Sequence, residues 1–145
     1  MGMLDVNTKF SVAQAVTSTG DTASTNIYDA GSAAAADFGL HESTWLNVLC
    51  STTATSGGAA TVAAVLQDSA DASSWADVLV GAALPVASVV AGTVMMQLVP
   101  PVGLRRYNRV VYRVGTAALT AGKFEAFYSS DVQRNVSRAS GFTVA

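Results

Sequence analysis

The chain has 145 residues, of which 50% are hydrophobic and only 12% are charged, and its formal net charge is −2. This length is typical of one domain with its own hydrophobic core, whereas the charged fraction is about half that of an average soluble domain. One histidine, one cysteine and no cluster of carboxylates argue against an enzyme, a cofactor or a metal site, and the missing charge favours a surface covered by other proteins.

The charges are divided unevenly along the chain. Residues 1–100 contain one lysine and eight acids, whereas residues 101–145 contain seven bases and two acids. This division favours head-to-tail contact between copies, or contact with an acidic protein surface. The basic part is too small and too poor in lysine to predict nucleic-acid binding.

Residues 1–9 lack the basic and apolar regions of a signal peptide and are predicted to form an N-terminal arm. After them, short runs of Val, Thr, Ala and aromatic residues alternate with segments rich in Gly, Ser, Asp and Pro, which is typical of β-strands. The predicted strands are residues 10–17, 25–29, 45–51, 60–68, 75–81, 93–99, 107–114 and 123–129.

Turn-forming residues separate these strands at residues 56–58, 68–71, 100–103 and 120–122. Only residues 30–40 have a composition compatible with a helix. The pattern predicts an all-β fold in which residues 10–129 form a single-domain antiparallel β-sandwich, jelly-roll-like with about eight strands. Residues 130–145 are predicted to be a C-terminal tail, and an immunoglobulin-like sandwich is the alternative fold.

Residues 78–104 carry no charge and are long enough to cross a membrane once as a helix. Three prolines and three glycines divide this segment into pieces too short to span a bilayer. We therefore predict two buried strands with a turn region between them, and no membrane partner.

Two residues with reactive side chains fit structural roles. Cys50 lies in an apolar run, which predicts a buried, inert thiol. His41 lies close in sequence to Asp37 and Ser43, but a catalytic triad brings its residues together from separate elements. We expect His41 to be a loop histidine.

Arginine and aromatic side chains gather in residues 101–113, and two further arginines lie in the predicted tail. Arginine binds carboxylates with two hydrogen bonds and stacks on rings, so it often anchors protein interfaces. The alternative is that these side chains only solvate an exposed sheet face. The candidate interface residues are Arg105, Arg106, Tyr107, Arg109, Arg113, Arg134 and Arg138.

Three segments resemble one family of capsid cement (decoration) proteins of tailed bacteriophages. They are residues 3–17 (MLDVNTKFSVAQAVT), 101–112 (PVGLRRYNRVVY) and 119–126 (LTAGKFEA). The resemblance implies a small β-sandwich that binds the outside of the virus head, made in the host cytoplasm. It also implies that the partner is the major capsid protein, bound across the boundaries between its subunits.

Self-association is expected as well, with a homodimer first because two-fold contacts are the commonest closed arrangement, and a trimer next. Replacing Arg109 and Arg113 by glutamate is expected to weaken binding to the shell. The alternative function is a carbohydrate- or receptor-binding sandwich of the virion, in which Trp45, Trp75 and Tyr107 would stack on sugars.

Overall fold

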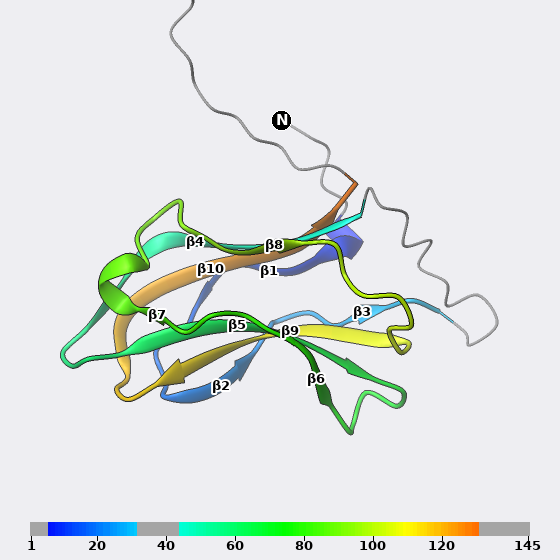
Figure 1. Cartoon of the computed structure of the whole chain (residues 1–145), viewed down its shortest axis with the longest axis horizontal. Helices are drawn as coiled ribbons and strands as arrows, with labels where there is room; N and C mark the ends of the chain where they lie inside the picture. Colours follow the sequence, from blue (N-terminus) through cyan, green and yellow to red (C-terminus); the bar gives the residue numbers. More distant parts are fainter. Residues whose placement is uncertain (1–5, 32–43, 131–145) are drawn as a thin grey trace, which may run out of the picture.

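A computed structural model of the chain describes residues 6–31 and 44–130. Ten strands and two short 3-10 helices form these parts, and no α-helix occurs in them. The strands pack as two antiparallel sheets face to face (Figure 1). The all-β sandwich predicted from the sequence is therefore confirmed.

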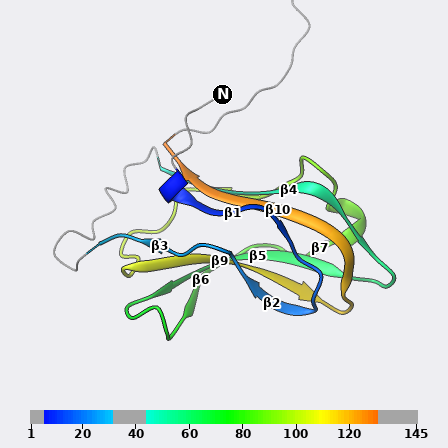
Figure 2. The same cartoon turned by 180° about the vertical axis from the view of Figure 1, so that it is seen from behind.

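Sheet A contains four strands in the order β1-β10-β4-β8. Its edges are β1 and β8; β8 lies in front in Figure 1 and β1 in Figure 2, which views the molecule from behind. The strands are β1 (Lys9–Ala15), β4 (Trp45–Ser56), β8 (Val94–Leu98) and β10 (Leu119–Ser129).

Sheet B has the order β2-β9-β5-β6, with β3 also paired to β9 and β7 also paired to β5. Strands β2 and β3 pair with successive parts of β9, and β6 and β7 pair with successive parts of β5. Each of these two pairs is therefore one interrupted strand. The strands are β2 (Gly20–Ala23), β3 (Tyr28–Asp29), β5 (Thr61–Ser69), β6 (Ala76–Val80), β7 (Leu84–Pro85) and β9 (Tyr107–Gly115).

With each interrupted strand counted once, residues 6–31 and 44–130 contain eight strand positions. Their orders in the two sheets are then 1-8-3-6 and 2-7-4-5, which is the arrangement of a jelly roll. The two 3-10 helices are η1 (Val6–Thr8), before β1, and η2 (Val86–Ser88), between β7 and β8. The jelly-roll expectation holds, and the immunoglobulin-like alternative is wrong.

The core lies between the sheets and is built by alternation along each strand. In β9, Val110, Tyr112 and Val114 point inward, as their spacing predicts. Tyr112 of sheet B stacks on Phe124 of sheet A with ring centroids 5.0 Å apart. The Tyr112 hydroxyl also forms a buried 2.5 Å hydrogen bond with Ser11 of β1, so a polar contact joins the sheets.

Several boundaries differ from the prediction. Residues 120–122, expected to be a turn, lie inside β10, where the pairing with β4 shifts register. The expected strand at residues 25–29 contains only the short β3, and β2 was missed because residues 20–23 include glycine and aspartate. The expected strand at residues 45–51 continues to Ser56, since its later Thr and Ser residues suit an exposed strand.

The charge-free segment at residues 78–104 was predicted to contain two buried strands with a turn region between them; the strands are present as β6 and β8, but the prediction that they are buried is wrong. The segment contains the end of β6, then β7, η2 and β8, whose residues are mostly exposed or half-exposed because these strands form sheet edges. Within the parts of the chain that the structure describes, no helix is long and apolar enough to cross a membrane.

Other predictions fall partly beyond the described ranges. Of the expected N-terminal arm, residues 6–8 form η1, Lys9 begins β1, and residues 1–5 lie outside. The helix expected at residues 30–40 is outside except for its first two residues, and the C-terminal tail is outside except for Ser130. Asp37, His41 and Ser43 are also outside.

Candidate interaction surfaces

The arginines of residues 105–113 all have partners within the chain. Arg106 donates from Nε and Nη2 to both carboxylate oxygens of Asp29, at 2.7 and 2.9 Å. Arg113 binds Asp21 in the same two-bonded way, at 2.7 and 2.9 Å, and also reaches Asp77 at 3.1 Å. These acids come from the first 100 residues, so pairs within one chain account for part of the uneven division of charge.

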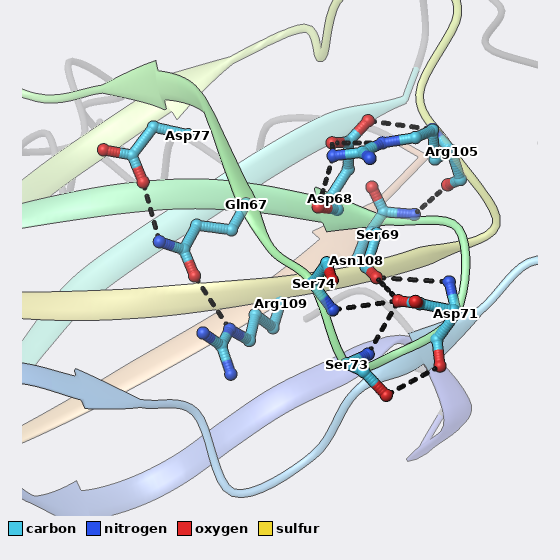
Figure 3. A network of polar contacts seen from close by, with 10 residues as sticks. All are labelled: Gln67, Asp68, Ser69, Asp71, Ser73, Ser74, Asp77, Arg105, Asn108 and Arg109. Carbon is cyan, nitrogen blue, oxygen red and sulfur yellow. Dashed lines mark hydrogen bonds and ion pairs between the residues drawn. The ribbon is translucent and has the colours of Figure 1, made fainter.

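Arg105 makes the most enclosed of these ion pairs. Its Nε and Nη2 donate to Oδ1 of Asp68 at 2.9 and 2.6 Å, and its backbone N–H donates to Oδ2 at 3.0 Å. The Asp68 side chain is only 9% exposed. Burial raises the pKa of Asp68, but the hydrogen bonds from Arg105 outweigh it and leave the pKa below its ordinary value. Figure 3 shows this pair beside the loop after β5.

That loop is ordered by the carboxylate of Asp71. Its Oδ1 accepts hydrogen bonds from the backbone N–H groups of Ser73 and Ser74, and from the Ser69 hydroxyl, all at 2.9 Å (Figure 3). Because these bonds favour the charged form, the pKa of Asp71 falls to about 2. These hydrogen bonds to Asp71 stabilise the turn between β5 and β6.

The outer face of sheet B is covered by long polar side chains, which we call the charged face; it consists of Asp21, Gln67, Trp75, Asp77, Arg109 and Arg113. Gln67 connects two of them, since its Nε2 donates to Asp77 and its Oε1 accepts from Arg109 (Figure 3). The Arg109 guanidinium lies 4.2 Å from the centre of the Trp75 ring. Beneath this layer, Val65 and Val111 are fully buried although they point away from the core.

The outer face of sheet A is different, because apolar side chains lie there with few charges. The register puts Glu125, Leu49 and Val94 in one row across β10, β4 and β8. A second row contains Lys9, Phe127, Asn47 and Gln97, and Trp45 lies beyond it. We call Trp45, Leu49, Val94 and Phe127 the apolar face; the first two and Phe127 are half-exposed, and Val94 is 50% exposed.

The aromatic residues considered for sugar binding are divided between these surfaces. A guanidinium covers one side of Trp75, and that of Arg106 lies 4.8 Å from the centre of the Tyr107 ring. Trp45 belongs to the apolar face. Within the described ranges, no group of three or more His, Cys, Asp or Glu residues could hold a metal ion.

Cys50 is buried on the inner side of β4, as predicted, and burial raises the pKa of its thiol. The sequence pointed to the arginines and did not reveal the apolar face. The alternation in residues 45–51 and 123–129 puts Leu49 and Phe127 on the faces opposite the core residues, which was the available signal. That signal did not show that β4 and β10 are neighbours.

A protein-family model described as Bbp16 matches residues 10–128. The match begins in β1 and ends in β10, so it spans both sheets. The chain belongs to the Bbp16 family. Membership in this family is compatible with a bacteriophage protein and with a virion structural role. Among curated proteins, none matches the chain.

In this Bbp16-family chain, the match includes Arg105, Arg106, Tyr107, Arg109 and Arg113. The remaining two candidate residues, Arg134 and Arg138, lie beyond the match and outside the described residues. That any of these arginines contacts a partner stays a prediction. The guanidinium groups of residues 105–113 already donate hydrogen bonds within this chain, so a binding protein would contact groups that are not free.

Proposed function

We propose that this protein is a capsid cement protein, which binds the outside of a bacteriophage head across boundaries between major capsid subunits. It acts without catalysis: binding to the closed shell but not to its separated subunits stabilises the shell by mass action. Many identical sites on one shell add their contributions. A clamp of this kind raises the temperature or internal pressure needed to open the head.

The observation that carries the proposal is the contrast between the two outer faces. The charged face satisfies its polar groups within the chain, whereas the apolar face leaves Leu49, Val94 and Phe127 partly in water. Large apolar areas rimmed by polar groups mark protein-interaction surfaces. We assign the apolar face to contact with the shell, and Bbp16 membership and the family resemblance support a role in the virion.

At two of its three rings, the carbohydrate-binding alternative receives less support from the same geometry. Sugar stacking needs an open ring face, and Arg109 and Arg106 occupy one side of Trp75 and Tyr107. The two rings also lie in a surface whose hydrogen bonds are largely satisfied internally. A protein-binding role uses the apolar face without breaking any of these contacts.

The test adds purified protein to undecorated heads and measures their thermal opening by calorimetry. We expect decorated heads to open at a higher temperature. Leu49→Lys should bind at least about tenfold more weakly, because a lysine on the apolar face must be desolvated at the interface. This variant is compatible with the fold, since position 49 lies opposite Glu125.

The control is Val80→Lys, which makes the same kind of change at a position 60% exposed in sheet B. It should bind heads as the wild type does. Unchanged thermal opening with wild-type protein would refute the cement function. Equal binding by Leu49→Lys would remove the apolar face from the interface. The earlier Arg109 and Arg113 test is less informative, since a glutamate at position 113 would repel Asp21 and Asp77 within the chain.

A further inference from the structure

The edges of the two sheets differ in how their backbone groups are protected. Unpaired strand edges invite pairing with another chain, and proteins block them with charges, prolines, breaks or covering segments. At the β1 edge, the Asn26 N–H donates to the Phe10 carbonyl at 2.8 Å. The Gln14 side chain also bonds Ala23 and Thr25, at 2.8 and 2.9 Å. This edge is therefore closed by its own chain.

Both edges of sheet B carry protective features. One edge consists of the short strands β2 and β3, which contain Asp21 and Asp29. The other is interrupted between β6 and β7, contains Asp77, and includes Pro85, which has no N–H to donate. Neither edge offers a continuous row of uncharged hydrogen-bonding groups.

The remaining edge, β8, has no charge, proline or break, and its protection is a bulge at its start. Val94–Leu98 contains no charge, proline or glycine, and its one register shift lies at its start, opposite Leu49. Among the described residues, its strand pairing is with β4 alone. Val94 is 50% exposed, and Met95, Gln97 and Leu98 are half-exposed.

The pairing with β4 shows which backbone groups point to the open side. Cys50 donates its N–H to Thr93 and accepts from Gly92, at 2.9 and 2.8 Å, so its backbone groups face the β8 side. Alternation along β4 gives Leu46 and Val48 the same direction, and their partners Leu98 and Met96 face back. The N–H and C=O groups of Gln97, which lies between these two partners, therefore point away from the sheet, whereas Met95 lies in the bulge at the register shift.

The partner that fits this edge best is a second copy of the chain. The whole segment of residues 78–104 is free of charge, so two copies can approach there without like charges meeting. A two-fold axis brings the same residues together from both sides, and an uncharged strand is complementary to itself. A charged partner strand would find no opposite charge in this segment.

We infer that β8 pairs antiparallel with β8 of a second copy and joins the two A sheets into one continuous sheet. This inference specifies the self-association part of the proposed function. The dimer would present two apolar faces side by side on one surface, so both could contact the shell. The backbone N–H and C=O groups of Gln97 would supply hydrogen bonds between copies.

The test compares wild type, Gln97→Pro and Gln97→Ala by sedimentation velocity over a range of concentrations. Both variants lose the 2.9 Å hydrogen bond from Gln97 Nε2 to Asn47, but only proline removes the edge N–H. Proline is tolerated where an edge N–H faces away from the sheet. We expect wild type and Gln97→Ala to dimerise, and Gln97→Pro to dissociate at least about tenfold more readily, because the two-fold contact loses that donor twice.

A folded Gln97→Pro that still dimerises normally would overturn the inference, and so would equal dissociation of Gln97→Ala. If Gln97→Pro does not fold, hydrogen exchange on the wild type decides. The amide of Gln97 should exchange more slowly as the protein concentration rises, and fast exchange in a dimer would overturn the inference. A wild type that stays monomeric would overturn it too, while leaving the cement function to be judged by head stabilisation. Protection of the Gln97 amide only on heads would assign the edge to the capsid protein instead.

Discussion

Carboxylates in ion pairs and turn networks dominate the chemistry of single residues in this protein. Hydrogen bonds from Arg106 and from the Gly31 N–H lower the pKa of Asp29 to about 2, and backbone N–H groups do the same for Asp71. The pKa of Asp77 is also lowered, first by its hydrogen bond from Gln67. Each of these groups favours the folded state while it is ionised.

The sign of the pH effect follows from these shifts. The ordinary pKa of 3.8 falls to about 2 on folding for Asp29 and Asp71. Their stabilising contribution is therefore complete above about pH 5 and is lost as the pH falls toward about 2. We expect the thermal midpoint, followed by circular dichroism, to drop over this range.

Asp71→Asn is the matched variant, because its side-chain oxygen can still accept hydrogen bonds but cannot be protonated in this range. Its thermal midpoint should fall less than that of the wild type between about pH 4 and 2. If the two curves run parallel, Asp71 does not supply the expected part of the acid sensitivity.

Irregularities within strands are important at the scale of elements. Gly122 lies in β10 with φ +151°, where the pairing with β4 shifts register. A Cβ at this position would lie 3.2 Å from the Cβ and 3.3 Å from the Cα of Ala54. The glycine thus lets β10 continue through a bulge against β4, where the sequence suggested that the chain would turn.

Gly122→Ala should therefore destabilise the fold by about 1–3 kcal/mol, because it combines backbone strain with close contact to β4. Chemical denaturation measures the change. Gly57→Ala is the control: no atom lies within 4 Å of the added Cβ, so its effect should stay within about 0.5 kcal/mol. Equal stability of both variants would show that the bulge tolerates a side chain.

At the scale of the whole molecule, contacts between residues distant in sequence hold the two sheets together. The Ser11–Tyr112 hydrogen bond joins residues 101 positions apart in the sequence. Both side chains are buried, so a hydroxyl group that lost its partner could not form a hydrogen bond with water in its place. The bond therefore tests how strongly one polar contact couples the sheets.

We expect Ser11→Ala and Tyr112→Phe each to lower the free energy of unfolding by about 1–3 kcal/mol, since each leaves a buried polar group unpaired. The double variant should lose less than the sum of the two, with a coupling energy of at least about 0.5 kcal/mol. Denaturant unfolding of the four proteins measures this cycle. Strictly additive losses would mean that the two hydroxyls are independent.

The sequence by itself determined the fold class and much of the core. Alternation in residues 60–68 and 107–114 identified the inward faces of β5 and β9, because side chains on a strand point alternately to its two sides. Turn residues limited the lengths of most strands, and the apolar run around Cys50 correctly predicted a buried thiol.

Only the tertiary structure decided what the surfaces carry. Arg105 pairs with Asp68, 37 positions away in the sequence, and Arg113 pairs with Asp21, 92 positions away. No local sequence pattern predicts pairs at such distances. Likewise, the neighbours of Leu49 and Phe127 on the apolar face, and the open edge of β8, depend on strand order. Local patterns determine which way a side chain points from its own strand, whereas its neighbours depend on long-range pairing.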